Sequence, residues 1–184
     1  MPSIIRRRDA LRLGAAALLG GFAQPAFARA LGADAPRRAI LHNLHTGETF
    51  DEVYYEGGRY VAQAMAQGMK VLRDWRTGEE KMIEPQLFDA LHAINLRLET
   101  DRPFQIISGY RSPQTNSMLH AKSSGVASNS QHTLGKAVDV RLQGVDLRNL
   151  RLAALDVAAG GVGFYPQSNF VHVDTGRVRQ WAGS

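Results

Sequence analysis

Strand-like and helix-like stretches alternate along this chain without the regular strand–helix–strand repeat that builds a parallel sheet. Residues 38–56 and 160–176 each contain two alternating apolar runs around a tight turn, at Thr46-Gly47 and at Pro-Gln-Ser-Asn, which is typical of β-hairpins. Hairpin strands pair in antiparallel order because their connection is short. The chain therefore predicts an α+β fold, in which a small, mostly antiparallel sheet has helices packed on one side.

Two stretches, 59–76 and 84–99, repeat apolar residues at helical spacing. Their predicted core faces consist of Val61, Met65, Met69 and Leu72 in the first stretch, and of Leu87, Leu91, Ile94 and Leu98 in the second. Pro85 suits the first turn of the second helix, where its missing N–H would be unpaired anyway. Two further helices are predicted to begin after Ser112 and Asp146, which can act as N-caps on either side of the strand "KAVDVRL".

Residues 1–28 have the pattern of an export signal. A basic start, "IIRRRDALR", precedes the small and apolar stretch "LGAAALLGGFAQPAFA", which ends in the Ala-Phe-Ala of a cleavage box. The apolar run is too short and too rich in Gly and Ala to predict a membrane span. The paired arginines favour twin-arginine export, which carries folded proteins, over an ordinary secretory signal. We therefore expect a twin-arginine type signal peptide at 1–28, contact with the twin-arginine export machinery during secretion, and a single domain at 29–184.

The net positive charge comes largely from this signal. Removing residues 1–28 removes four arginines and one aspartate, so the formal charge falls from +5 to +2. No basic stripe interleaved with aromatic residues remains, which argues against a nucleic-acid partner. The chain has no cysteine, so it forms no disulfide, and any metal must be held by His, Asp or Glu. A lipid-modified cysteine is excluded too, and we expect no stable membrane anchor after signal removal.

Two strand-like stretches direct metal-ligating side chains away from the apolar core. In "KAVDVRL" alternation turns Asp139 away from the valines, toward a face that can be open, and in "FVHVD" it puts His172 and Asp174 together. His132 precedes Asp139 by seven residues in "SQHTLGKAVDV". Two imidazoles and one carboxylate bind Zn²⁺ and leave a fourth position for water. On spacing alone, the simpler interpretation is a turn histidine and a strand aspartate paired with Arg141.

The surrounding residues favour the metal site. "SQHTLGKAVD" resembles the zinc motif Ser-x-His-x-x-Gly-x-Ala-x-Asp of the superfamily that contains D-Ala-D-Ala carboxypeptidases, VanX dipeptidases and, as a relative in fold, the hedgehog signalling domain. "ISGYRS" resembles the strand end that carries their substrate-polarising arginine, and "FVHVDTG" the strand of their last zinc ligand. The resemblance implies the zinc ligands His132, Asp139 and His172, one Zn²⁺ per chain, and a catalytic role for Arg111. A salt bridge from Arg111 to an acid such as Asp139 is the structural alternative.

One branch of this superfamily is more similar still, the YcbK-like (MepK) murein endopeptidases, which are exported by the twin-arginine route. "LHNLHTGE", "ISGYRSPQTN", "GGVGFYP" and "SNFVHVDTGRVRQW" all resemble that branch. The resemblance implies a periplasmic zinc endopeptidase that hydrolyses the peptide cross-links of peptidoglycan, with its stem peptides as partners. The alternatives are a D,D-carboxypeptidase acting on uncross-linked stem peptides and a non-catalytic, zinc-stabilised peptidoglycan-binding module.

The general base departs from the pattern of many relatives. They carry a Glu three residues, or a His two residues, before the last zinc histidine, where this chain has Asn169 and Phe170. Asp174 is the nearest acid, two residues after His172 on the same strand face. It is the candidate catalytic base, although a structural role, or the orientation of a metal ligand through a hydrogen bond, is slightly favoured.

Overall fold

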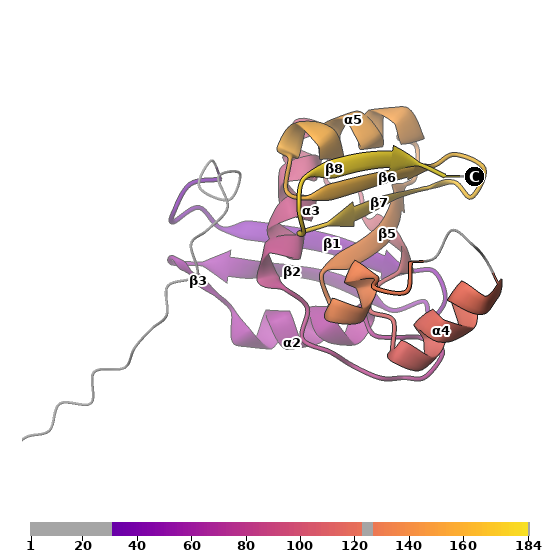
Figure 1. Ribbon diagram of the computed structural model, residues 1–184. Coiled ribbons are helices and arrows are strands. Elements are labelled where there is room, and N and C mark those ends of the chain that lie inside the picture. Colours follow the sequence, from indigo (N-terminus) through magenta and orange to yellow (C-terminus); the bar gives the residue numbers. More distant parts are fainter. Residues whose placement is uncertain (1–30, 123–126, 184) are drawn as a thin grey trace, which may run out of the picture.

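The computed structural model describes residues 31–122 and 127–183 of the chain (Figure 1). The strands in these ranges are β1 (Arg37–Asn43), β2 (Thr49–Glu56), β3 (Arg59–Tyr60), β4 (Phe104–Ser108), β5 (Ala137–Leu142), β6 (Gly161–Tyr165), β7 (Phe170–Asp174) and β8 (Arg179–Ala182). The helices are α2 (Ala62–Val71), α3 (Pro85–Arg97), α4 (Pro113–Lys122), α5 (Leu147–Val157) and the short 3₁₀ helix η1 (Gln131–Leu134). The predicted signal peptide at 1–28 lies outside the described residues, and no helix within them has the length and apolar content to cross a membrane.

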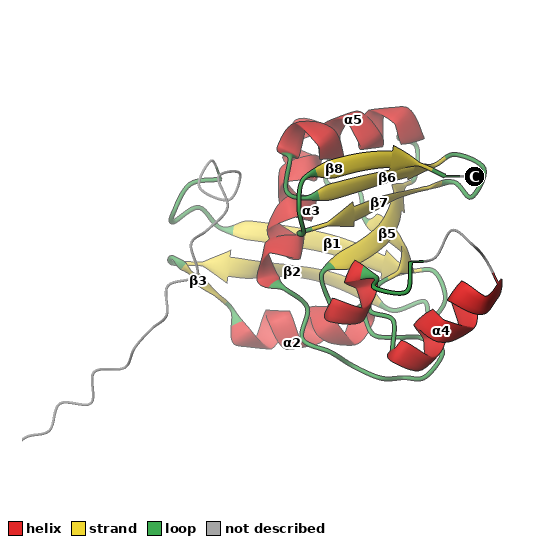
Figure 2. Ribbon diagram, in the orientation of Figure 1, coloured by secondary structure: helices red, strands yellow, loops and turns green. Residues whose placement is uncertain are grey.

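All described strands belong to one sheet, in the order β3-β2-β1-β4-β5-β7-β6-β8 (Figure 2). The hairpins β1–β2 and β6–β7 are confirmed, and neighbouring strands are antiparallel except where β1 pairs with β4 and β6 with β8. The α+β class with mostly antiparallel strands is thus confirmed. The sequence patterns did not predict β3, β8 or η1, because each has four residues or fewer and shows no clear periodicity.

A single apolar core joins the sheet to helices α2, α3 and α5. Met65 of α2, Leu91 of α3 and Ala154 of α5 are buried in it together with Val140 and Val171 of the central strands. Successive side chains of a strand point to opposite faces, so the polar residues between these valines lie on the other side of the sheet. That side holds the candidate site.

The buried face of α2 differs from the predicted one. Val61 and Met69 are only half-buried, whereas Ala64 and Gly68 are buried. Gly68 lies so close to the ring of Phe88 in α3 that an added Cβ would come within 2.6 Å of it. The small residues therefore let α2 approach its neighbour closely, and this rotates the helix relative to the stripe of large apolar residues.

The predicted helix starts agree with the structure. Pro85 occupies the first turn of α3, and the Asp146 carboxylate accepts the backbone N–H of Arg148 at 2.7 Å to cap α5. The Ser112 hydroxyl accepts the N–H of Thr115 at 3.1 Å at the start of α4. These caps satisfy N–H groups that a helix leaves unpaired at its first turn.

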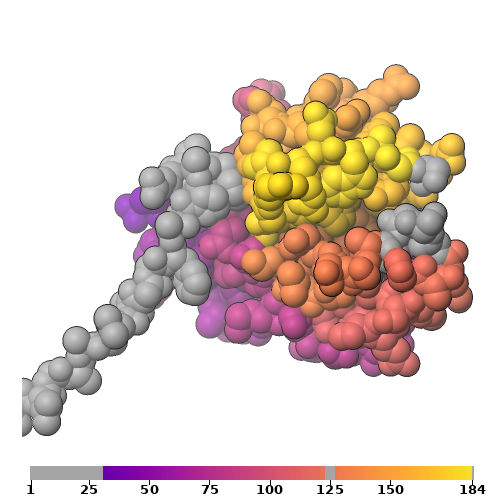
Figure 3. All heavy atoms as spheres, in the orientation of Figure 1, coloured from indigo at the N-terminus to yellow at the C-terminus, as the bar shows by residue number. Residues whose placement is uncertain are grey.

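The face of the sheet that carries the site is covered at Asp139, whose exposed fraction is only 3%. The cover comes from η1 and from the loop between β4 and α4, which are joined where the Arg111 N–H donates to the His132 carbonyl at 3.2 Å. Figure 3 shows the orange segment that contains η1 meeting the yellow C-terminal strands on the visible face. The expectation that this face is open at Asp139 is therefore wrong, because segments distant in the sequence close over the strand.

Candidate metal centre

Three side chains converge between β5, β7 and η1. His132 Nε2 lies 3.1 Å from Asp139 Oδ1 and 3.1 Å from His172 Nδ1, and these last two atoms are 2.9 Å apart. Ligands at the usual zinc distances of about 2.0–2.1 Å would lie about 3.3 Å apart in a tetrahedral site, so the cluster fits a zinc ion with little adjustment. Each of the three residues offers one atom that could bind a metal, and these atoms all lie within 4.8 Å of one another. Among the described residues, this is the group of His, Asp or Glu side chains that could hold a metal ion.

Helix η1 positions His132. The Ser130 hydroxyl accepts the His132 backbone N–H at 3.3 Å, and Gly135 ends the helix in the left-handed region at a φ of 69°. A Cβ at Gly135 would also lie 2.3 Å from a backbone oxygen of Met82, so glycine is required there on two grounds. The Nδ1 atom of His132 lies 2.7 Å from the Gly109 carbonyl oxygen. Because a carbonyl oxygen only accepts, Nδ1 carries the proton and Nε2 presents its lone pair to the cluster.

His172 is held by Asp174 on the side of the ring that faces away from the cluster. Its Nε2 lies 3.1 Å from Asp174 Oδ2, so this nitrogen donates and Nδ1 presents its lone pair to His132 and Asp139. Asp174 is fully buried and also accepts the backbone N–H groups of Gly161 at 2.9 Å and Gly176 at 2.8 Å. A metal-ligating histidine is commonly oriented by a carboxylate in this way.

Asp139 lies directly opposite His172, since the register of β5 and β7 pairs these two residues. Its Oδ1 faces the two histidines, while its Oδ2 accepts a hydrogen bond from Arg111 Nη2 at 2.5 Å. Arg111 Nε donates to the Ser108 hydroxyl at 2.8 Å. Asp139 is not paired with Arg141, which instead donates to Gln105 at 2.8 Å. The simpler interpretation of the sequence, a strand aspartate paired with Arg141, is therefore wrong.

The charges of the cluster are strongly coupled. Burial lowers the pKa of His132. Burial would raise the pKa of Asp139, but the charge and hydrogen bond of His132, together with His172 and Arg111, hold this pKa well below its usual range. Burial also opposes protonation of His172, but its hydrogen bonds to Asp139 and Asp174 outweigh this and raise its pKa. Asp139 is therefore ionised, as a carboxylate that binds a metal has to be, and a metal ion bound here would compete with a proton for His172.

Strand β8 brings two side chains to the site that the sequence patterns did not reveal. Arg179 Nη2 lies 2.7 Å from Asp174 Oδ2, and the Trp181 ring centroid lies 5.2 Å from that of His172. A Cβ at Gly161 would collide with the Arg179–Asp174 pair at 2.4–2.5 Å, so this position requires glycine. A partial signal exists, because "RVRQW" follows a Thr-Gly turn, but four residues are too few for periodicity to identify a strand.

The cluster consists of two histidines and one aspartate, and an arginine lies beside it. Among the described residues it has no fourth protein ligand, which leaves a position for water or substrate. This arrangement on an α+β sheet is the metallopeptidase type of centre. Residues 32–181 match the family model described as "Peptidoglycan L,D-endopeptidase MepK". The chain belongs to this family, within the D-Ala-D-Ala carboxypeptidase-like superfamily of zinc peptidases, and the predicted resemblance is confirmed.

Individual relatives agree with the family model. The chain is 47% identical over 176 residues to the peptidoglycan L,D-endopeptidase MepK of Escherichia coli K12, a match that covers 95% of this chain and 96% of the relative. It is 38% identical over 149 residues to the probable peptidoglycan L,D-endopeptidase MepK of Haemophilus influenzae, with 80% of each chain covered. The similarity therefore includes the whole candidate metal centre.

Proposed function

We propose that this chain is a zinc-dependent endopeptidase that hydrolyses peptide cross-links of peptidoglycan. The observation that carries the proposal is the convergence of His132, Asp139 and His172 beside Arg111. Family membership supports the same conclusion, because the relatives are named as peptidoglycan endopeptidases. We further propose that residues 1–28 direct twin-arginine export and that the mature domain, 29–184, acts in the periplasm with one zinc ion per chain.

A bound zinc ion would supply a Lewis acid and lower the pKa of a water molecule at its open position. Arg111 would add a second positive charge next to it. Its Nε and Nη2 atoms are held by Ser108 and Asp139, and among the described residues Nη1 makes no hydrogen bond. The guanidinium is therefore fixed in place with its Nη1 amino group free to meet the scissile carbonyl oxygen as negative charge develops there. The Arg111–Asp139 salt bridge and the catalytic role are thus compatible.

Asp174 is better suited to orient His172 than to act as the base. It contacts the Nε2 side of the imidazole, whereas the opposite nitrogen, Nδ1, faces the cluster. Its two oxygens already accept hydrogen bonds from backbone N–H groups and from Arg179. Burial would raise its pKa, but the hydrogen bonds from His172, Arg179 and the two backbone N–H groups lower it far below the usual range, so it takes up a proton poorly.

The names of the relatives support a choice between the possible cross-links. An L,D-endopeptidase cuts a bond between an L-configured and a D-configured centre, as in the link that joins two diaminopimelate residues. We propose this bond as the substrate, in preference to the D-Ala to diaminopimelate cross-link.

Incubation of the mature protein with intact sacculi, with and without a chelator, tests this function. We expect monomeric products from cross-linked dimers, with dimers joined through two diaminopimelates consumed first and activity restored by added zinc. Loss of a terminal D-Ala alone would instead identify a carboxypeptidase. Co-sedimentation with sacculi without any product would identify a binding module, and either result would contradict the proposal.

A further inference from the structure

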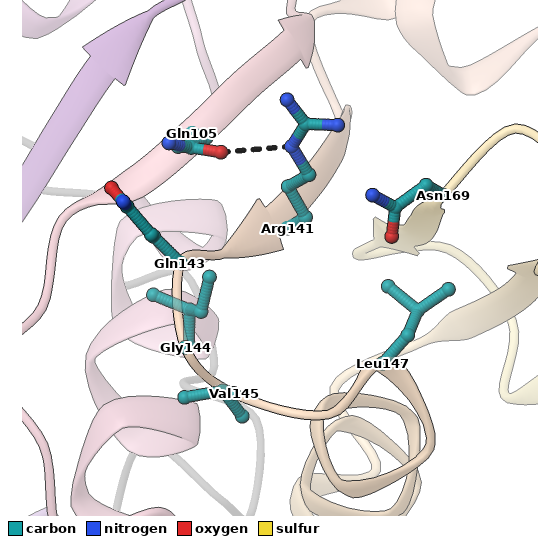
Figure 4. A pocket seen from close by; sticks show the side chains of 8 residues that line it. Gln105, Arg141, Gln143, Gly144, Val145, Leu147 and Asn169 are labelled. Atoms are coloured by element: carbon teal, nitrogen blue, oxygen red, sulfur yellow. Dashed lines mark hydrogen bonds between the residues drawn. The ribbon is translucent and has the colours of Figure 1, made fainter.

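A polar pocket lies where β5 ends and the chain turns toward α5 (Figure 4). Its volume is about 410 Å³. It is lined by Gln105, Arg141, Leu142, Gln143, Gly144, Val145, Leu147 and Asn169. Among the described residues that line it, one is a cation and none is an acid, so the pocket favours an anionic group.

Strand geometry places this pocket next to the reacting centre. Arg141 follows Asp139 by two residues on β5, so both side chains lie on the same face with their Cα atoms about 7 Å apart. Gln105 is the direct neighbour of Arg141 on β4. Asn169 lies in the turn that leads into β7, three residues before His172. An extended peptide covers this distance in about two residues, and the long side chain of Arg141 can shorten it, so a group next to a scissile bond at the metal centre lies within its reach.

The Arg141 side chain lines the pocket and uses one of its nitrogens in a bond to a neighbouring strand. Its Nε donates to the Gln105 side-chain oxygen at 2.8 Å. Figure 4 shows the other two guanidinium nitrogens turned away from Gln105, with the amide of Asn169 directed toward the same space. Two parallel N–H groups of a guanidinium match the two oxygens of a carboxylate.

We propose that Arg141 and this pocket bind a carboxylate of the substrate peptide next to the scissile bond. This inference rests on the proposed function and adds a specificity residue to it. Arg141 differs from Arg111 in its task, because Arg111 is tied to the metal ligand Asp139 whereas Arg141 makes no contact with the cluster in the described residues. Arg141 would therefore strengthen substrate binding and selection and leave the metal unaffected.

Two carboxylates of a link between diaminopimelate residues lie within reach. The residue that supplies the amine retains a carboxylate on the carbon that bears the scissile nitrogen. The residue that supplies the carbonyl carries a second carboxylate at its far end, several bonds away. The carboxylate on the amine side is closer to the scissile bond, and we assign the pocket to it. Dimers amidated at one carboxylate or the other distinguish these two sources.

Kinetics on such dimers test the assignment. For the unmodified dimer, we expect Arg141→Gln to lower kcat/KM roughly 10- to 100-fold, mainly through KM, which is the loss typical of a hydrogen-bonded charge pair. Amidation on the amine side should cause a similar loss in the wild type and little further loss in Arg141→Gln. Arg59→Gln, at the far edge of the sheet on β3, removes the same charge as a matched control and should behave as wild type.

Binding of uncross-linked stem peptides, measured by calorimetry, tests the pocket without cleavage. The free carboxylate peptide should bind the wild type more tightly than its amide, and Arg141→Gln should abolish this preference while keeping its zinc content and Tm. An unchanged preference in Arg141→Gln, or a wild type that does not distinguish acid from amide, would overturn the inference. Absence of cleavage by the wild type would instead count against the proposed function, so the two failures remain distinct.

Discussion

Asp139 of the metal cluster and Arg141 of the pocket lie two residues apart on the same face of β5, yet their surroundings differ. Each cluster side chain is buried and held from two sides, as His172 is by Asp139 and Asp174. Arg141 is half-buried and makes a single described side-chain hydrogen bond, to Gln105. A group that stabilises developing charge must be oriented before the reaction. A group that selects a substrate can remain solvated until the substrate arrives.

The largest effect should come from removing a metal ligand. His132→Ala or His172→Ala should abolish cross-link hydrolysis and stoichiometric zinc binding, because two remaining ligands hold the ion poorly. The loss of Tm should be smaller, since the apolar core forms without the site. Elemental analysis of protein purified without added metal should show about one zinc per chain in the wild type.

His120→Ala in α4 is the matched control for this first prediction and should retain both zinc and activity. Full hydrolysis by His132→Ala would show that His132 is not a ligand of a catalytic metal. A wild type without a stoichiometric transition metal, and without a gain in activity on zinc addition, would contradict the metal centre itself.

The next effect sharpens the contrast between the two arginines. Arg111→Lys keeps the positive charge but loses the planar guanidinium. A lysine ammonium cannot bond Ser108 and Asp139 and at the same time donate to the scissile carbonyl in the same geometry. We expect turnover to fall about 100- to 1,000-fold, which is typical of losing one donor to a developing oxyanion. Zinc content should remain near that of the wild type, as determined by elemental analysis alongside single-turnover kinetics. Arg148→Lys, at an exposed position of α5, serves as the control, and normal turnover in Arg111→Lys would refute the role.

Asp174→Asn should have an intermediate effect that depends on zinc concentration. The change keeps the shape of the side chain but weakens its bonds to His172 and Arg179. Loss of a group that orients a ligand typically costs about 10- to 100-fold in metal affinity or activity. We expect weaker zinc binding in a chelator competition titration and partial recovery of activity at high zinc.

A base behaves differently, since Asp174→Asn would then keep its zinc and lose activity that no added zinc restores. Unchanged zinc affinity in this variant would therefore contradict the orienting role. Asp101→Asn, on an exposed loop, is the control for the loss of one carboxylate.

The smallest effect concerns Asp74, which braces the loop that carries Arg111. Its carboxylate accepts the backbone N–H groups of Ser112 at 2.9 Å and Arg76 at 3.0 Å. Burial would raise its pKa, but hydrogen bonds from Thr115, Ser112 and Arg76 lower it to about 2. Because this folded-state pKa lies below the unfolded value of about 3.9, the stabilisation is complete above about pH 4 and is lost as the pH falls toward 2.

Thermal unfolding of metal-free protein at several pH values tests this brace. The Tm of the wild type should fall between about pH 4 and pH 2, whereas Asp74→Asn should start lower at pH 6 and fall less over that interval. Asp101→Asn should follow the wild type. Parallel curves for wild type and Asp74→Asn would show that Asp74 contributes no pH-dependent stability.

Local periodicity and turn chemistry were sufficient to predict the hairpins, the helix starts at Pro85 and after Asp146, and the strand faces of Asp139 and His172. These features depend on residues a few positions apart, and a strand fixes which side chains share a face wherever it pairs. The motif around His132 added the third member of the cluster through family resemblance, since spacing alone favoured a different partner for Asp139.

Only the tertiary structure decided which other groups meet these side chains. Pairing of β8 with β6 brings Arg179 to Asp174, and the closure of η1 over β5 buries Asp139 and gives it Arg111 rather than Arg141 as its partner. The register of β4 and β5 then leaves Arg141 with Gln105 at the edge of a pocket. The Arg111–Asp139 and Gln105–Arg141 contacts join residues 28 and 36 positions apart, and the Arg179–Asp174 contact, although local in sequence, depends on the pairing of β8 with β6. Local periodicity carries no information on such register and loop closure.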